Sequence, residues 1–308
     1  MLKNQLFGVE VEMTGITREK AARIVAEVLE SVPSQPEANC YHTRNIIDQT
    51  ARKWKIMRDS SICPIINDGT NAALDEYKVE FVTPPLNYSD IELLQNIIRK
   101  LRENGAKAHS SCGIHIHVDG ANHTAITLRR LVSFMTARQD LIYEALQIGD
   151  REKHWCHKLN KTLLDAMKKD KNITKDKAEE IWYSKANDGY CGGINHQHYN
   201  DTRYHGINIH SFFTKGTVEF RLFNSTLHAG KIKAYIQFCL AVSAWAITSN
   251  DKLVFRSMDN YTAEQKVTIM RNILTHRLGL YGDEFKTCRL HMMNPLKKAA
   301  GMAVREAA

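Results

Sequence analysis

The sequence predicts a mixed fold in which strands and helices alternate along one chain of 308 residues. Short apolar runs with period-2 alternation are followed by segments whose apolar residues recur at helical spacing. The chain is 43% hydrophobic and 25% charged, which is typical of a globular protein with a sizeable core. Taken alone, the alternation favours a parallel α/β sheet. Neither an internal repeat nor a linker is evident, so we expect a single domain over residues 1–308.

The N-terminal part of the chain combines strands with two helices. In order, we expect a strand at 6–12, a helix capped by Thr17, a loop at 33–53, strands at 53–62 and 76–86 that form a hairpin around the turn 67–71, and a helix that begins with a capping box of Ser89 and Glu92 and ends at Gly105.

The rest of the chain repeats this mixture around a basic insertion. In order, we expect a strand at 112–120, a helix at 127–149, a basic helical insertion at about 151–206 in which Thr174 caps a helix, strands at 207–213 and 216–223, a buried helix at 234–248, a last helix from Thr262 boxed by Gln265, and a mobile tail from about residue 295.

The net charge of +8 does not predict nucleic-acid binding, because half of the excess lies in one segment. Residues 151–185 hold ten Lys and Arg against six Asp and Glu, without the interleaved aromatic residues of a base-stacking surface. Weak attraction to anionic partners such as nucleotides remains. The chain has no apolar run of about 18 residues, and its seven cysteines lack CxxC spacing. We therefore expect a cytoplasmic protein that contacts no membrane.

Four strands combine an apolar face with a face of ionisable residues. Successive strand side chains point to opposite faces, so residues i and i+2 share one face. In the strand expected at 207–213, Asn208 and His210 also lie on one face. An antiparallel sheet with one face in water would explain any single strand. The ionisable sets are Glu10 with Glu12, Glu80, His115 with His117 and Asp119, and Glu219 with Arg221.

These residue types bind metal ions and phosphate, whereas a solvated face normally carries Lys, Thr, Ser and Gln. Clustered carboxylates repel one another unless a cation compensates them. Mg²⁺ and Mn²⁺ favour carboxylate oxygens with an occasional imidazole, and a neighbouring arginine is typical of a phosphoryl clamp. Glu10 and Glu12 lie about 6.6 Å apart along their strand. Each can therefore hold a different ion of a metal cluster that brackets phosphate.

Six segments, taken in order, resemble the carboxylate–amine ligase superfamily, which includes glutamine synthetase and glutamate–cysteine ligase, and within it the amidoligase branch. They are "FGVEVEM", "WKIMRDSSI", "YKVEFVTPPL", "GIHIHVDG" and "YHGINIHSFFTKGTVEFRLFNSTL", with the helix that follows. Each motif alone is weak, since ExE or HxH occurs widely by chance. Their order and spacing over residues 6–250 are specific.

The resemblance implies an α+β fold: a curved, largely antiparallel, glutamine synthetase-like sheet with flanking helices, whose concave face holds ATP and metal ions. This expectation overrides the parallel sheet. The implied enzyme phosphorylates a carboxylate with ATP, and an amine then attacks the acyl phosphate to give an amide, ADP and phosphate. The expected cofactors are ATP and Mg²⁺ or Mn²⁺. The expected partners are a small-molecule or peptide carboxylate and an amine, and the oligomeric state is open.

The resemblance assigns metal ligands residue by residue. Glu10, His115 and Glu219 match ligands of the metal ion nearer the β- and γ-phosphates. Glu12 and Glu80 match ligands of the ion nearer the acceptor carboxylate. The chemistry agrees with these residue types, because in phosphoryl transfer a protein mainly positions groups and neutralises charge.

Four further residues are candidates for catalysis or for binding the nucleotide. Arg221 would stabilise charge on the transferring phosphoryl group, and Arg203 is a candidate to bind phosphate or carboxylate. His117 is a candidate second ligand, although a supporting role beside His115 is the simpler interpretation. Asp59, in "RDSSI", is either an amine-binding or proton-transfer group or a turn residue at a strand end. The general base for the amine is not identified.

Three other interpretations stay open. The HxH motif in "GIHIHVD" also resembles that of metal-dependent hydrolases and would predict a (β/α)₈ barrel. A basic nucleic-acid-binding module would bind in a salt-sensitive manner. A zinc site could draw on the loop at 186–206, where a polar loop over an active site is the favoured interpretation, because the spacing of its residues matches no standard zinc finger. These residues are Cys191, His196, His198 and His205.

Overall fold

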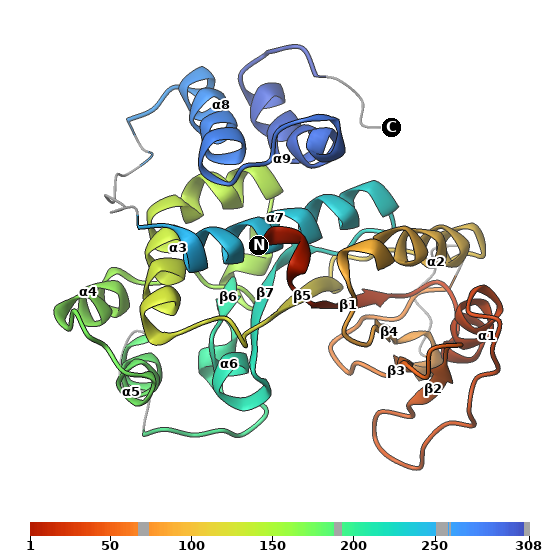
Figure 1. Cartoon of the computed structure of the whole chain (residues 1–308). Coiled ribbons are helices and arrows are strands. Elements are labelled where there is room, and N and C mark those ends of the chain that lie inside the picture. Colours follow the sequence, from red (N-terminus) through yellow and green to blue (C-terminus); the bar gives the residue numbers. More distant parts are fainter. Residues whose placement is uncertain (67–73, 188–192, 251–257, 259, 305–308) are drawn as a thin grey trace. The chain divides into compact units, whose positions relative to one another are not determined.

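The computed structural model describes residues 1–66, 74–187, 193–250, 258 and 260–304 (Figure 1). Within these ranges the fold is α+β, with seven strands and nine α-helices. The chain divides into two compact units. The N-terminal unit comprises Leu6–Ile116 and Phe223–Lys233. The C-terminal unit comprises Met1–Gln5, His117–Leu222 and Ala234–Ala308.

The N-terminal unit is built on an antiparallel sheet. The strand order is β2-β3-β4-β1-β5, and β4 pairs antiparallel with both β1 and β3. The parallel sheet that the strand–helix alternation favours is therefore wrong, because β4 lies between β1 and β3 and runs antiparallel to both. The strands are β1 (Phe7–Met13), β2 (Arg44–Ile47), β3 (Lys53–Met57), β4 (Val79–Val82) and the first part of β5 (Gly113–Asp119).

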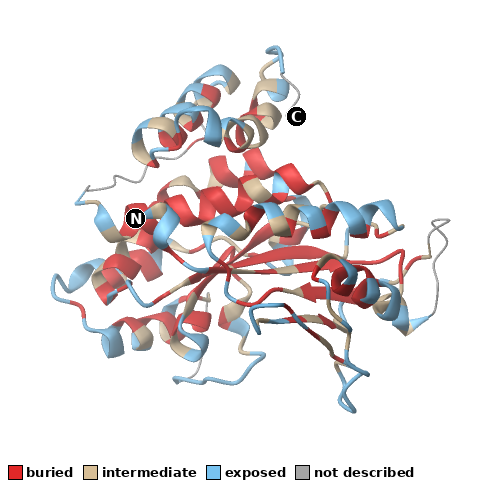
Figure 2. Cartoon of the chain, turned by 45° about the vertical axis from the view of Figure 1, so that its right-hand side comes forward, coloured by how far each residue is buried: buried red, intermediate tan, exposed pale blue. Residues whose placement is uncertain are grey.

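Two helices, α1 (Arg18–Val28) and α2 (Ile91–Glu103), pack against each other, and α1 also contacts β2 and β3. The predicted N-cap of α1 is confirmed, because the Thr17 side chain accepts a hydrogen bond from the N–H of Lys20. The strand residues opposite the ionisable ones are apolar and buried, which matches the predicted alternation (Figure 2). Within this core Trp54 stacks on Phe81 at a centroid distance of 5.9 Å.

Strand pairing corrects two expectations about this unit. Residues 44–47 form β2 inside a segment that the sequence predicts to be a loop, because they pair with β3 and bury Ile46 opposite Trp54. The predicted strands at 53–62 and 76–86 do pair as neighbours, but the paired parts are shorter. The predicted turn at 67–71 lies outside the described residues.

The start of α2 differs from the predicted capping box. A single turn of 3-10 helix precedes α2, and its capping box joins Asn87 and Asp90 rather than Ser89 and Glu92. The earlier box arises because Asp90 can accept the N–H of Asn87 directly. At the other end, Gly105 adopts a φ of 103°, a left-handed conformation that ends the helix as predicted.

The C-terminal unit is mainly helical. Helix α3 packs against α4, α5 and α9, and α8 packs against α9. Strands β6 and β7 pair antiparallel. The elements are α3 (Ala125–Leu146), α4 (Lys161–Lys169), α5 (Lys175–Lys185), β6 (Ile207–Asn208), α6 (His210–Lys215), β7 (Thr217–Asn224), α7 (Ala229–Thr248), α8 (Ala263–Asn272) and α9 (Lys286–Ala299), with β7 and α7 shared with the N-terminal unit.

Predicted caps and burial are confirmed for several of these helices. Thr174 caps α5, and Thr262 forms a capping box with Gln265 at the start of α8. The predicted helix at 234–248 is buried, and its Trp245 ring lies 5.1 Å from the ring of Phe134 on α3. Among the described residues, we find no helix with both the length and the apolar character that crossing a membrane requires.

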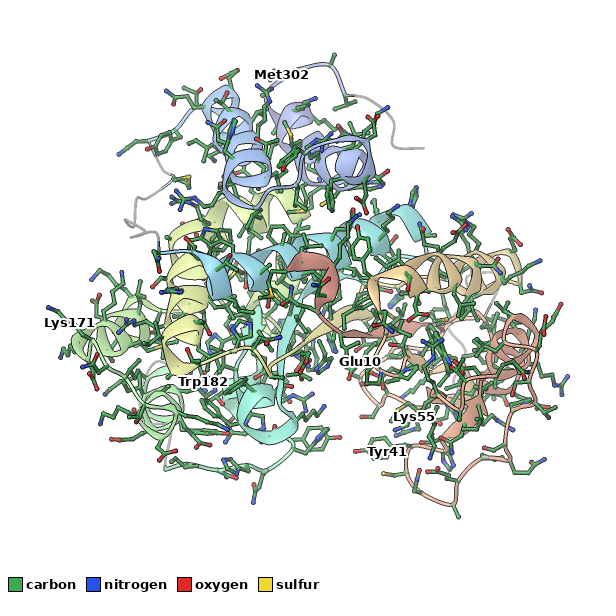
Figure 3. The ribbon with its side chains drawn as sticks, viewed as in Figure 1. Glu10, Tyr41, Lys55, Lys171, Trp182 and Met302 are labelled. Carbon is green, nitrogen blue, oxygen red and sulfur yellow. The ribbon has the colours of Figure 1, made fainter. Side chains whose placement is uncertain are left out.

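The basic insertion is helical as predicted, but it is not solvated on all sides. Trp182 on α5 is fully buried, and its Nε1–H donates to Thr202 Oγ1 at 3.1 Å. Lys171, in the turn between α4 and α5, is exposed (Figure 3). Each insertion helix therefore has one face that belongs to the core of the unit.

The predicted strand at 207–213 is wrong beyond Asn208, because His210–Lys215 form α6. Gly216 ends this short helix with a φ of 73°, so the chain turns directly into β7. A second difference concerns the C-terminal end. Helix α9 continues through Pro295 to Ala299, into the segment that the sequence predicts to be a tail.

Candidate functional site

Four of the predicted metal ligands form an acidic cluster in the N-terminal unit. Strand β1 carries Glu10 and Glu12, β4 carries Glu80 and β5 carries His115. The register of β1 and β4 sets Glu12 directly opposite Glu80. Glu12, Glu80 and His115 are each less than 9% exposed, whereas Glu10 is half-buried. The strand alternation therefore places three carboxylates and one imidazole on one face of the sheet, as the sequence predicts.

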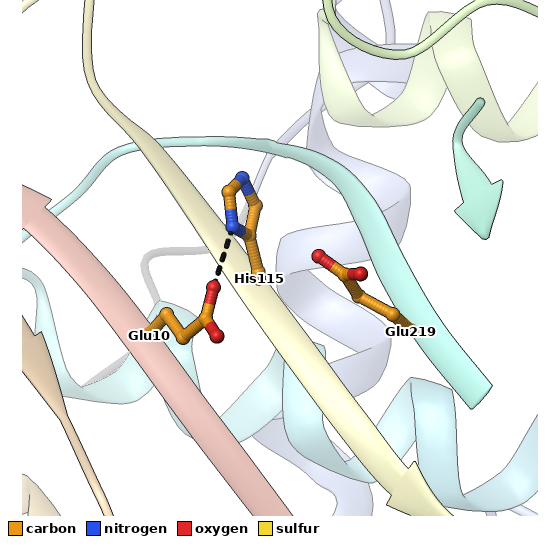
Figure 4. A group of neighbouring side chains, drawn as sticks. All are labelled: Glu10, His115 and Glu219. Carbon is orange, nitrogen blue, oxygen red and sulfur yellow. Dashed lines mark hydrogen bonds and ion pairs between the residues drawn. The ribbon is translucent and has the colours of Figure 1, made fainter. Parts of the chain in front are cut away.

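His115 lies at the centre of this acidic cluster. Its Nδ1 lies 2.9 Å from Glu10 Oε2 (Figure 4), and its Nε2 lies 3.8 Å from Glu12 Oε1. The second oxygen of Glu12 accepts a hydrogen bond of 2.6 Å from the backbone N–H of Gly113. One ligand atom each from Glu12, Glu80 and His115 lie within 4.8 Å of one another. The side chains are therefore close enough to share one ion.

The donor set of the acidic cluster fits a hard divalent cation. Buried carboxylates that face each other carry like charges and have lost water, so both effects oppose their ionisation. A cation removes both penalties at once. Mg²⁺ and Mn²⁺ take carboxylate oxygens with an occasional imidazole. A thiolate, which would indicate a zinc or copper site, is not among these four residues.

A second cluster, the arginine cluster, lies in the C-terminal unit and contains His117, Asn208, Glu219 and Arg221. Because β6 pairs with β7, Asn208 lies directly opposite Glu219. Arg221 Nη1 donates to Glu219 Oε1 at 2.7 Å, and Asn208 Nδ2 donates to Glu219 Oε2 at 2.7 Å. His117 Nε2 lies 3.8 Å from Glu219 Oε1. Both oxygens of one buried carboxylate thus have polar partners.

The arginine cluster holds its guanidinium in a fixed position. Arg221 is 4% exposed, and its guanidinium carbon lies 5.9 Å from the centroid of the Tyr204 ring. His117 Nδ1 is 2.9 Å from Thr217 Oγ1, which orients the imidazole. A buried ion pair with further hydrogen bonds favours one geometry over others. The arrangement presents a preoriented positive group of the kind that binds phosphoryl oxygens.

Strand β5 contributes one imidazole to each cluster. His115 belongs to the acidic cluster and His117 to the arginine cluster, two residues further along the same strand. His117 Nδ1 contacts Thr217, and a role for His117 in supporting His115 stays a prediction.

The two remaining candidates belong to neither cluster, although Arg203 lines a pocket together with Asn208 and Glu219. Arg203 lies in the wall of a pocket in the C-terminal unit, and its Nη1 donates to the carbonyl oxygen of His198 at 2.9 Å. Asp59 follows β3, and its Oδ1 accepts hydrogen bonds from the N–H and the hydroxyl of Ser61. That local bonding is typical of a turn, and a role for Asp59 with the amine stays a prediction.

The pocket that contains Arg203 has a volume of about 220 Å³. We call it the α6 pocket, because α6 forms one wall. The sequence places Asn208 and His210 together. It does not predict that α6 lines the pocket, since the segment has the pattern of a strand. The lining residues are His196, His198, Arg203, Asn208, His210, Ser211, Thr214, Lys215 and Glu219.

His210 is held as a neutral imidazole in the wall of the α6 pocket. Its Nδ1 lies 2.6 Å from the hydroxyl oxygen of Tyr183 on α5. Burial, with the nearby positive charge of Arg203, lowers the pKa of His210 to about 4. Burial also raises the pKa of Tyr183 well above its usual range. The contact of Tyr183 was not predictable from the sequence, because Tyr183 lies on the insertion, 27 residues from His210.

The zinc interpretation gains no support from the described residues. His196 pairs with Glu179 at 2.6 Å, and His205 Nε2 lies 2.9 Å from Asn187 Oδ1. His205 also contacts the Trp182 ring, with centroids 5.8 Å apart. The potential metal-binding groups in the described part of the chain include none of these histidines. Cys191 lies outside the described residues.

The fold and the clusters define an α+β protein whose antiparallel sheet carries buried carboxylates and imidazoles of the types that bind divalent cations. The chain belongs to the family described as "Putative amidoligase enzyme", whose model matches residues 3–243. The match spans both clusters and the α6 pocket. The family name denotes a ligase-type enzyme. A comparison with curated proteins found no match.

Proposed function

We propose that the protein is an ATP-dependent carboxylate–amine ligase with a glutamine synthetase-like catalytic fold. The observation that carries the proposal is the acidic cluster: Glu12, Glu80 and His115 bring their ligand atoms within 4.8 Å of one another from three separate strands. An exposed polar face would not need to bury two facing carboxylates. Membership of the amidoligase family supports the reaction class.

The bound metal ions would neutralise phosphate charge and hold the nucleotide and the carboxylate substrate in line. In this proposal Glu12 and Glu80 hold the ion nearer the carboxylate substrate, and Glu10 and His115 ligate the ion nearer the β- and γ-phosphates. The family resemblance also assigns Glu219 as a ligand of the ion nearer the β- and γ-phosphates. His117 takes a supporting role, because Thr217 orients its imidazole and its Nε2 lies 3.8 Å from Glu219 Oε1.

The proposed reaction has two group transfers. A carboxylate oxygen attacks the γ-phosphorus, the bond to the bridging oxygen breaks, and ADP leaves with that electron pair. The amine nitrogen then attacks the acyl carbon, the C–O bond to phosphate breaks, and the displaced proton leaves with phosphate or solvent. Arg221 acts in the first transfer, because its fixed guanidinium can bind the equatorial oxygens where charge is spread.

A nucleotide assay tests this proposal. ADP release is measured with ATP and Mg²⁺ while carboxylates and amines are supplied in pairs. We expect ADP release that requires both substrates and falls by a factor of about 10² to 10³ in Arg221→Lys, since a lysine cannot reproduce the bidentate guanidinium. Glu103→Gln, at the exposed end of α2, is the control for a substitution on the surface and should release ADP as the parent does.

Two results would contradict the proposal. Amide hydrolysis without nucleotide would favour the metal-dependent hydrolase. That alternative already lacks its predicted parallel barrel, because β1, β3 and β4 pair antiparallel. Tight, salt-sensitive binding of nucleic acid without any ATP turnover would favour the basic binding module.

A further inference from the structure

The α6 pocket carries positive charge that no acidic side chain of the described chain pairs with. Arg203 bonds only to a backbone carbonyl and stacks near two tyrosine rings, Tyr199 and Tyr204, at 5.6 and 5.7 Å. Lys215, at the end of α6, is exposed and makes no ion pair within the described residues. Two cations in the wall of one small pocket favour an anionic group on its ligand.

Asn208, in the same pocket, favours a hydrogen-bond donor on the ligand. It is 2% exposed, and its Nδ2 donates to Glu219 Oε2 at 2.7 Å. This bond shows that the amide nitrogen of Asn208 faces Glu219, because the amide oxygen would repel the carboxylate. Asn208 Oδ1 is consequently left buried with no hydrogen-bond partner among the described residues. An unsatisfied buried acceptor is costly, and a ligand N–H that enters the pocket would satisfy it.

The dimensions of the pocket limit the ligand to a small molecule. A volume of about 220 Å³ is below the ~300–1,000 Å³ typical of sites for drug-sized ligands. A small ligand with an anionic group and an N–H donor would match both features of the pocket. An α-amino acid has both: its carboxylate suits Arg203 and Lys215, and its amino group suits Asn208 Oδ1 and the Glu219 side.

We infer that the α6 pocket binds the amine substrate, and that this substrate is a free α-amino acid. The use of the amino acid as an acceptor rests on the proposed ligase function, whereas its binding does not. Bound in this way, the amino group lies beside Glu219 and Asn208, and the carboxylate points toward Arg203 and Lys215. His210, neutral in the pocket wall, faces the bound molecule without adding a charge.

Calorimetric titration of the whole chain tests the binding. The twenty common L-amino acids are screened first. The best is then compared with its own carboxamide, which lacks the carboxylate, and with its N-acetyl derivative, which lacks the ammonium group. We expect each derivative to bind about tenfold or more weakly, since each loses a charge-assisted hydrogen bond.

Two variants locate the binding in the α6 pocket. Arg203→Gln should lower the affinity for the amino acid by about tenfold. It should change the already low affinity for the carboxamide little, because the substitution and the carboxamide each remove the same interaction. Lys168→Gln, on the exposed end of α4, removes the same charge elsewhere and should bind the amino acid normally. A ligand series measured on the unchanged protein keeps the test valid even if Arg203→Gln is poorly folded.

Three results would overturn the inference. They are that no amino acid binds, that the carboxamide binds as tightly as the acid, or that Arg203→Gln weakens the binding of ADP rather than the binding of the amino acid. The last would assign the pocket to nucleotide phosphate. The two proposals fail separately. Amino-acid binding without ATP turnover would refute the ligase and keep the pocket, whereas ADP release that requires ammonia but no amino acid would keep the ligase and refute the pocket.

Discussion

Arg221 and Glu219 form a buried ion pair within a single strand, with Arg221 Nη1 2.7 Å from Glu219 Oε1 and both side chains 5% exposed or less. Residues two apart on a strand share one face, so β7 itself holds the pair together. Asn208, from the neighbouring strand β6, donates to the other carboxylate oxygen. Glu219 thus fixes the position of the Arg221 guanidinium through contacts within two paired strands.

Removing the arginine of this pair should cost stability as well as activity. In Arg221→Ala the Glu219 carboxylate keeps Asn208 but loses its counter-charge, so we expect the free energy of unfolding to fall by about 3–5 kcal/mol. Urea unfolding measures this. Replacing the pair together, as Arg221→Met with Glu219→Gln, should recover part of the loss. An Arg221→Ala protein as stable as the parent would show that the ion pair is not formed in solution.

Divalent cations should stabilise the protein through the acidic cluster. We expect Mn²⁺ or Mg²⁺ to raise the melting temperature and EDTA to reverse the rise, because the ion binds the folded cluster and not the unfolded chain. Glu12→Gln and Glu80→Gln should each weaken Mn²⁺ binding by a factor of about 10² or more. Losing a residue that only hydrogen-bonds to a metal ligand already lowers metal affinity about 10–100-fold. Glu103→Gln should bind Mn²⁺ as the parent does. Equal affinity in all three variants would refute the metal assignment.

Acid should destabilise the C-terminal unit through His123. Its Nδ1 lies 3.1 Å from Thr127 Oγ1 and its Nε2 lies 2.8 Å from Ser243 Oγ. Burial lowers the pKa of His123 to about 4. Between this value and the usual ~6.5 of an unfolded histidine, the unfolded chain binds more protons, so stability is fully present above pH 6.5 and falls as the pH drops toward 4.

The measurement for His123 is urea unfolding at a series of pH values. A pKa difference of this size corresponds to about 3 kcal/mol across the window. His123→Gln, which has no titrating group, should be less stable near pH 8 but should show a flatter dependence on pH from 6.5 to 4. Parallel pH curves for the two proteins would exclude His123 as the source of the acid sensitivity.

Gly206 should tolerate no side chain. A Cβ at this position would lie 2.1 Å from the hydroxyl oxygen of Tyr143, which donates to the carbonyl oxygen of Cys156 at 2.7 Å. The carbonyl oxygen of Gly206 accepts from the N–H of Arg221, so movement here would also displace the arginine. We expect Gly206→Ala to lower the free energy of unfolding by about 1–3 kcal/mol. Gly193→Ala, where a Cβ meets nothing within 4 Å, is the matched control, and a similar loss in both would refute the clash.

Much of the acidic cluster could be predicted from local sequence, because strand periodicity is a local property. Glu10 and Glu12 share a face whatever β1 pairs with, and the apolar alternation of β4 and β5 assigns Glu80 and His115 to theirs. The caps at Thr17, Thr174 and Thr262 are local in the same sense. The capping box before α2 could not be decided this way, since Asn87 with Asp90 and Ser89 with Glu92 are overlapping motifs of the same spacing.

The sequence by itself determined which side chains face the same way along each strand, and with the family resemblance it predicted a class of chemistry. Only the tertiary structure decided which strands are neighbours: that Glu12 opposes Glu80, that Asn208 opposes Glu219, and that α6 turns a predicted strand into the wall of a pocket. The physical reason is that strand pairing joins segments far apart in the chain. Its register depends on the packing of the whole sheet and on turns such as Gly216, which local periodicity does not encode.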